Sequence, residues 1–172
     1  MAVLKIADET LQARILWADG KYDDAIQHLQ AAVAAEDALK YDEPPQWVFP
    51  VRQSLGGAYL ALGGKPYAEQ ARRAFCADLA KHPKNARSFY GLARALGKLD
   101  DAANATLAWQ EYQKASRWAD QAHKSLTDDA LWLLGMPAGP QAGSDGERAP
   151  APPPAVPPGP SCPEHPLLAS PG

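Results

Sequence analysis

The residues best suited to contact a ligand lie in a charged, proline-rich stretch at residues 42–52, in which Trp47 and Arg52 stand out. An indole ring and a guanidinium group can pack on a bound chain and donate hydrogen bonds to it. The same stretch also has a structural interpretation. Its prolines suit the first turn of a helix, Trp47 packs on the preceding helices, and Arg52 pairs with Asp42 or Glu43. We favour the structural interpretation and leave the ligand contact open.

Catalytic and metal-binding motifs are absent from the sequence. The four histidines are scattered, and none lies four residues from another, as a zinc motif on a helix requires. Cys76 follows Phe75 in a stretch with a buried pattern, so we expect a small core residue rather than a nucleophile. Glycine-rich phosphate loops and a nucleophile elbow are also missing. The sequence therefore predicts no enzyme and no cofactor.

Charge and hydrophobicity argue against several classes of partner. The chain has 17 basic and 20 acidic residues, a net charge of -3, which gives no basic surface for nucleic acid or an anionic membrane. No stretch approaches the roughly 18 to 20 apolar residues of a membrane span. The first residues lack the basic start and apolar run of a secretory signal. We therefore expect a soluble, cytoplasmic protein.

The distribution of proline divides the chain into two parts. Of the 17 prolines, 12 lie in residues 136–172, where apolar periodicity is also lost. Such a segment cannot offset its ordering entropy by burial, so we predict a disordered, extended tail at 136–172 and a folded domain at 1–135. Residues 152–157 resemble ligands of SH3 or WW modules, but an inert extension is the favoured interpretation.

Apolar residues before the tail recur at helical spacing, and runs that alternate with period two are absent. Glycines at 20, 63, 64 and 97 punctuate the pattern and favour turns between helices. The pattern predicts an all-α domain of three helical hairpins. Its sixth helix is expected to run to about His123, and a last short helix is expected at 128–134.

A repeat connects the second and third hairpins. Leu55-Gly56 aligns with Tyr90-Gly91, and the two glycines are 35 residues apart. The second unit then continues with Tyr59, Ala71-x-x-x-Phe75 and Pro83. These residues resemble the L-G-x2-Y, A-x3-F and terminal proline of the tetratricopeptide repeat (TPR) family, whose period is 34. A small Gly56 lets helices approach, aromatic rings fill the space between them, and Pro83 stops the second helix.

The TPR resemblance implies a right-handed superhelical α-solenoid. It comprises about three repeats and a C-terminal helix, with approximate repeat bounds at 6–40, 47–83 and 84–117. Arg52 stands where the family pattern has tryptophan, and extra residues from Gly63 to Pro66 are expected to lengthen the turn of the second unit.

The stretches 41–56 and 78–85 also look like the C-terminal repeats of longer bacterial TPR proteins of unassigned function. The first helix begins near Met1 without the polar cap that solenoids need. We therefore expect an exposed apolar face at that end, which favours self-association or a missing preceding part.

The resemblance places the ligand groove along the first helix of each pair. Some family members bind a peptide C-terminus there through a clamp of asparagine and basic residues, and Asn85, Arg87 and Arg94 are the nearest equivalents. A solvated polar face is the favoured alternative. The full set of candidate peptide-binding residues is Arg14, Trp17, Trp47, Arg52, Gln53, Asn85, Arg87, Ser88 and Arg94.

The function expected from these features is a non-catalytic protein-interaction or scaffold module. It would bind a peptide or helix of a partner protein through the groove or through the uncapped N-terminal end. The alternative is a structural self-assembly module, or a fragment of a longer TPR protein without its own ligand. Neither nucleic acid nor a membrane is an expected partner.

Overall fold

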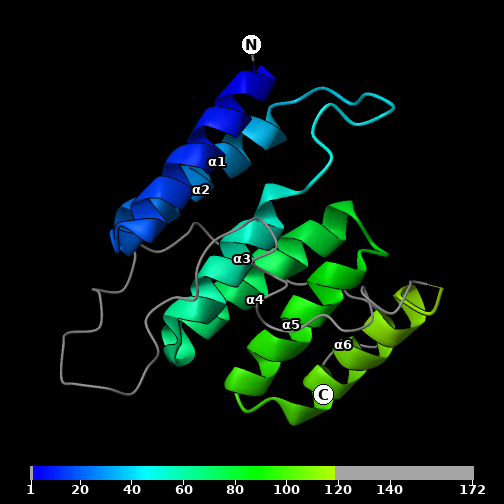
Figure 1. Cartoon of the computed structure of the whole chain (residues 1–172). Coiled ribbons are helices and arrows are strands. Elements are labelled where there is room, and N and C mark those ends of the chain that lie inside the picture. Colours follow the sequence, from blue (N-terminus) through cyan, green and yellow to red (C-terminus); the bar gives the residue numbers. More distant parts are fainter. Residues whose placement is uncertain (1, 119–172) are drawn as a thin grey trace.

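The structure is a computed structural model that describes residues 2–118. Within this range the chain forms α-helices and no strand, joined as three antiparallel hairpins (Figure 1), which confirms the all-α prediction. The helices are α1 (Ala2–Ala18), α2 (Tyr22–Asp37), α3 (Val51–Leu62), α4 (Gly64–Lys81), α5 (Ala86–Lys98) and α6 (Ala102–Ala115). The helix expected at 128–134 and the tail expected at 136–172 lie outside the described residues.

The turns within the hairpins follow from local sequence. Gly20, between α1 and α2, has a φ of 76°, a left-handed conformation that glycine adopts without steric cost. The expected long turn after α3 was wrong, because Gly63 alone separates α3 from α4. Pro66 lies in the first turn of α4, where a missing backbone N–H costs no hydrogen bond. The residues from Gly64 to Pro66 therefore extend the helix instead of the turn.

The third hairpin begins and ends with side-chain caps. Asn85 accepts a hydrogen bond from the Arg87 N–H at the start of α5, and Asp101 accepts one from the Asn104 N–H at the start of α6. Helix α6 ends at Ala115, not near His123. The Ser116 hydroxyl donates to the Tyr112 carbonyl (2.7 Å), a local bond that competes with further helical turns.

The core joins the second and third hairpins around the ring of Phe75. This side chain of α4 is fully buried between Gly56 of α3 and Gly91 of α5. A Cβ atom would lie 2.6 Å from the Phe75 Cζ at Gly56 and 2.2 Å from it at Gly91, far inside van der Waals contact. The two glycines that define the sequence repeat therefore contact the same ring, and α3, α4 and α5 pack closely because of it.

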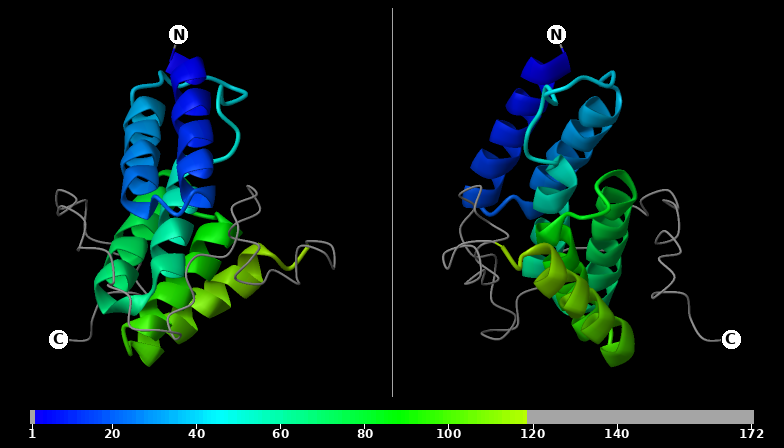
Figure 2. Two further views of the ribbon diagram at one scale, coloured as in Figure 1. Left: turned by 60° about the vertical axis from the view of Figure 1, so that its left-hand side comes forward. Right: turned by 90° about the vertical axis from the view of Figure 1, so that its right-hand side faces the viewer.

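The first hairpin forms one end of the molecule, and helices α3 to α6 form the other (Figures 1 and 2). Helix α2 is connected to α3 by an irregular segment, residues 38–50, which we call the linker. It loops out beside the far end of the first hairpin before α3 begins (Figure 2). By contrast, only residues 82–85 separate α4 from α5. The two junctions between hairpins are therefore built differently.

Candidate functional site: two cavities that meet at the linker

Two cavities lie along the linker and the first helices of the hairpins. The α1–α3 cavity has a volume of about 280 Å³ and is lined by Ala7, Thr10, Leu11 and Arg14 of α1, by Trp47 and Phe49, and by Val51 and Ser54 of α3. The α3–α5 cavity has a volume of about 740 Å³ and is lined by residues 45 and 47–50, by Gln53, and by residues 82–87. Trp47 and Phe49 line both cavities, so the linker forms their common wall.

Three residues that line the α1–α3 cavity each carry a buried polar atom without a hydrogen-bond partner among the described residues. The atoms are Nε of Arg14, Nε1 of Trp47 and Oγ of Ser54. Ser54 is only 3% exposed, so bulk water has little access to its hydroxyl and does not replace the missing hydrogen bond. An unpaired buried donor costs about 1–3 kcal/mol. Three such atoms on residues that line one cavity therefore need an explanation beyond the stability of the fold.

The hydroxyl of Thr10 is already engaged, since it donates to the Ile6 carbonyl in its own helix (2.7 Å). The remaining lining of the α1–α3 cavity is apolar, and the described lining includes no acidic residue. Arg14 is the only cation among the described residues of this lining. The cavity therefore presents donors and one positive charge within an apolar wall, a combination that suits a negatively charged acceptor.

The α3–α5 cavity is wider and is lined by proline rings and by the basic residues Lys84 and Arg87. Its linker wall includes Val48 and Phe49, which are 72% and 55% exposed. Such exposed apolar side chains beside a hollow are typical of surfaces that contact a partner. As in the α1–α3 cavity, no acidic residue belongs to the described lining.

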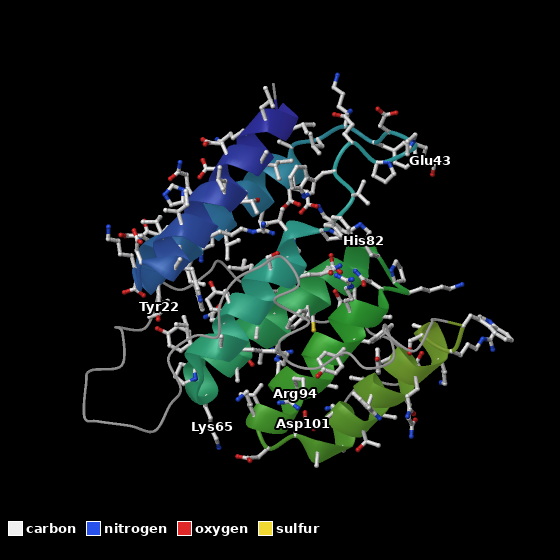
Figure 3. The ribbon with its side chains drawn as sticks, viewed as in Figure 1. Tyr22, Glu43, Lys65, His82, Arg94 and Asp101 are labelled. Carbon is white, nitrogen blue, oxygen red and sulfur yellow. The ribbon has the colours of Figure 1, made fainter. Side chains whose placement is uncertain are left out.

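An ion-pair network fixes the linker end of α3 to the first hairpin. Arg52 donates two hydrogen bonds to the Asp37 carboxylate, Nη1 to Oδ1 at 2.7 Å and Nη2 to Oδ2 at 2.5 Å, and Lys81 of α4 also donates to Asp37. The expected pairing of Arg52 with Asp42 or Glu43 was wrong. Glu43 lies at the outer tip of the linker (Figure 3) and accepts a hydrogen bond from Tyr41 instead.

The charges in this network have shifted pKa values. Burial alone would raise the pKa of Asp37, but the hydrogen bonds from Arg52 and Lys81 outweigh burial and hold the pKa below its usual value. Burial raises the pKa of the neighbouring Glu36, although its carboxylate accepts a hydrogen bond from the Val51 N–H (3.1 Å) at the start of α3. Glu36 thus acts from α2 as the cap that α3 lacks in its own sequence.

A second carboxylate, Asp78 of α4, organises the turn between α4 and α5. It is fully buried and accepts hydrogen bonds from Ser88 Oγ (2.5 Å), Asn85 Nδ2 (2.8 Å) and His82 Nδ1 (2.9 Å). Figure 3 shows His82 where α4 ends, close to the start of α3. These bonds satisfy the carboxylate inside the protein, so Asn85 and Ser88 have a structural role.

The structure brings together five of the nine candidate residues at the cavities. Arg14 and Trp47 line the α1–α3 cavity, and Trp47, Gln53, Asn85 and Arg87 line the α3–α5 cavity. The other four are elsewhere. Trp17 is buried in the core and packs edge-on against Tyr22, Arg52 is paired with Asp37, Ser88 is bonded to Asp78, and Arg94 is exposed on α5 and lines neither cavity.

Two important residues escaped the sequence analysis. Ser54 lies between Val51 and Leu55 on the buried stripe of α3, and this position on the stripe was the signal for a buried hydroxyl. Phe49 had no comparable signal, because an aromatic residue in an irregular segment has no periodicity to place it. Only the fold of the linker brings Phe49 against α1.

Within residues 2–118, no group of three or more His, Cys, Asp or Glu side chains is arranged to hold a metal ion. None of the helices in this range has the length and apolar character to cross a membrane. No family model, curated protein or solved structure matches this chain.

Proposed function

We propose that this chain is a TPR-like interaction module that binds an extended peptide of a partner protein along the two cavities. The observation that carries the proposal is the meeting of the cavities at Trp47 and Phe49, with three unpaired donors on one side and Lys84 and Arg87 on the other. A module of this kind needs no catalytic group. It needs an apolar surface for contact and donors that fix the register of the bound chain.

The repeat-like features support a solenoid arrangement as part of this proposal. Hairpins follow one another in sequence, α4 packs on α5, and α3 also contacts α5. The glycines of two successive units contact the same Phe75 ring. In such an arrangement the first helices α1, α3 and α5 share one face of the array, and both cavities are lined from these helices.

The charge of the cavities favours an acidic peptide. The chain as a whole has a net charge of -3, but the cavity linings contain Arg14, Lys84 and Arg87 and no acidic residue among the described residues. A local positive potential on a negatively charged protein selects partners of opposite sign and disfavours basic ones.

The test is selection of peptides from a phage-displayed random library on the full chain, followed by calorimetry with the synthetic peptides. Selected peptides should be acidic, and Trp47→Ala should weaken their binding about 30-fold, as removal of a central aromatic anchor does. Tyr41→Ala is the matched control, because Tyr41 is an aromatic residue of the same linker that lines neither cavity. Equal binding by the wild type and Trp47→Ala would reject this function.

Self-association is a second candidate function, favoured by one specific observation. Leu4, Leu11 and Ile15 are 64%, 55% and 48% exposed along α1, a helix of the hairpin at one end of the array. Their spacing places them on one stripe of the helix. Light scattering over a concentration series tests this candidate. A dimer that Leu4→Gln with Ile15→Gln dissociates would support it, and a strict monomer at high concentration would reject it.

A further inference from the structure

The α1–α3 cavity has a more specific ligand chemistry than the general proposal requires. Its three unpaired polar atoms come from three different elements, Arg14 on α1, Trp47 on the linker and Ser54 on α3. The Arg14 and Trp47 groups are donors only, because a guanidinium and an indole have no acceptor. A ligand that satisfies all three must therefore offer acceptors without competing donors.

A carboxylate is the group on an amino-acid side chain that meets this condition, since its two oxygens accept several hydrogen bonds. An amide would place its own N–H2 donors against the donors of the cavity. A phosphate carries about two negative charges at neutral pH, whereas the cavity lining holds one guanidinium. The charge and hydrogen-bonding capacity of the cavity thus match a single carboxylate.

The apolar part of the lining distinguishes between sources of that carboxylate. Leu11, Phe49 and Val51 line the same cavity as the donor residues, and Val51 is buried. This wall suits the two methylene groups of a glutamate side chain. A chain end would instead bring its polar backbone N–H and its own side chain into the same 280 Å³.

We propose that the α1–α3 cavity binds a glutamate side chain of the partner peptide, with Arg14, Trp47 and Ser54 as hydrogen-bond donors to its carboxylate. This inference rests on the proposed peptide-binding function and specifies which residue of the bound peptide the α1–α3 cavity recognises. The peptide backbone then passes over Phe49 toward the α3–α5 cavity, where Lys84 and Arg87 lie. Glutamate is the anchor, and the wider cavity accommodates the flanking residues.

The test uses the indole N–H resonance of Trp47 in ¹⁵N-labelled full-length protein, assigned with Trp47→Phe. The probes are N-acetylglutamate α-methylamide, which carries only the side-chain carboxylate, its glutamine counterpart, N-acetylalanine, which carries only a chain-end carboxylate, and inorganic phosphate. We expect the glutamate probe to move this resonance saturably. The glutamine probe should bind at least about tenfold more weakly, since it lacks the charge-assisted bonds.

Variants of the donors locate the binding. Arg14→Gln should weaken the glutamate probe about tenfold, and Ser54→Ala should weaken it by a smaller factor. Lys5→Gln removes one positive charge from an exposed position of the same helix as Arg14 that lines neither cavity, and it should leave binding within about twofold, which separates a local contact from the general field of the protein. Circular dichroism checks that each variant is folded. If Arg14→Gln does not fold, Ser54→Ala still tests the proposal.

Several outcomes would overturn the inference. They are tighter binding of N-acetylalanine or phosphate than of the glutamate probe, equal binding of the glutamine probe, and no movement of the Trp47 resonance. The proposed function fails separately. If library peptides bind at the cavities without a preference for glutamate, peptide binding stands and the glutamate site is rejected, whereas no selected peptide at all rejects the proposed function itself.

Discussion

Ser54 and Ser88 lie 34 residues apart, near the starts of α3 and α5, and both are buried, yet they have different surroundings. Ser88 donates to the carboxylate of Asp78, which also binds Asn85 and His82. Ser54 has no partner among the described residues and lines the α1–α3 cavity. A buried serine near the start of a first helix is therefore satisfied in the third hairpin and left unpaired in the second, although the two serines are offset by one position in the Gly56–Gly91 register.

The two junctions between hairpins differ in how completely their groups are packed and paired. The junction between the second and third hairpins, which we call the closed junction, is packed around the buried Phe75 ring, and the α3–α5 cavity lies outside this packing, at the turn of residues 82–85. The junction between the first and second hairpins, which we call the open junction, contains the linker, the Arg52–Asp37 ion pair and the α1–α3 cavity. Close packing serves stability, and unsatisfied donors cost stability, so the open junction is where a ligand would be recognised. Stability and binding measurements can test this contrast.

The largest expected effect is at the closed junction. Gly91→Ala places a methyl group 2.2 Å from the Phe75 ring and should lower the free energy of unfolding by about 3 kcal/mol, because the ring is confined on both sides. Urea denaturation followed by circular dichroism measures this change. Gly97→Ala is the matched control in the same helix, where nothing lies within 4 Å, and it should stabilise by up to about 1 kcal/mol. Equal effects of the two substitutions would contradict the packing role of Phe75.

A smaller loss is expected when the Asp78 network is broken. Ser88→Ala removes one donor from a fully buried carboxylate and should lower the free energy of unfolding by about 2 kcal/mol. Ser116→Ala is the comparison, because its hydroxyl donates to a carbonyl of its own helix, and it should cost about 1 kcal/mol or less. A Ser88 variant as stable as the wild type would show that Asp78 is satisfied without it.

The closed junction could largely be anticipated from the sequence. Gly56 and Gly91 stand at repeat spacing with Phe75 between them, and helical periodicity predicts the helices α3, α4 and α5. The Asp78 network was not anticipated, because a carboxylate near the end of a helix resembles an ordinary surface charge. Its burial depends on how the turn at 82–85 folds back, which is a tertiary effect.

The open junction was harder to predict. The linker has no periodicity, so the sequence indicated that Trp47 and Arg52 were special without showing which neighbours they contact. Arg52 was expected to pair within the linker and pairs instead with Asp37 at the end of α2. The packing of the hairpins determines which charged groups a long side chain can reach. Sequence distance within an irregular segment does not show which groups these are.

The ion pair at the open junction predicts a pH-dependent effect. The folded pKa of Asp37 lies below its ordinary value of 3.8, so its stabilising contribution is complete above that pH and is lost as the pH falls through the folded pKa. Asp37→Asn should therefore lower the free energy of unfolding at pH 7 by about 1 kcal/mol or less, because the pair is partly exposed. The difference from the wild type should shrink below about pH 4. A constant difference from pH 7 to pH 3 would contradict this assignment.

The smallest stability effect is expected at Ser54, and it sharpens the contrast with Ser88. Because the Ser54 hydroxyl has no partner, Ser54→Ala removes a buried polar group without breaking a hydrogen bond, so the free energy of unfolding should change by less than about 0.5 kcal/mol or increase. Urea denaturation of Ser54→Ala and Ser88→Ala under identical conditions measures the difference. A loss at Ser54 as large as that at Ser88 would mean that its hydroxyl is satisfied within the fold. A neutral Ser54→Ala that weakens the glutamate probe would separate the two roles, because a hydroxyl that contributes nothing to stability would then contribute to binding.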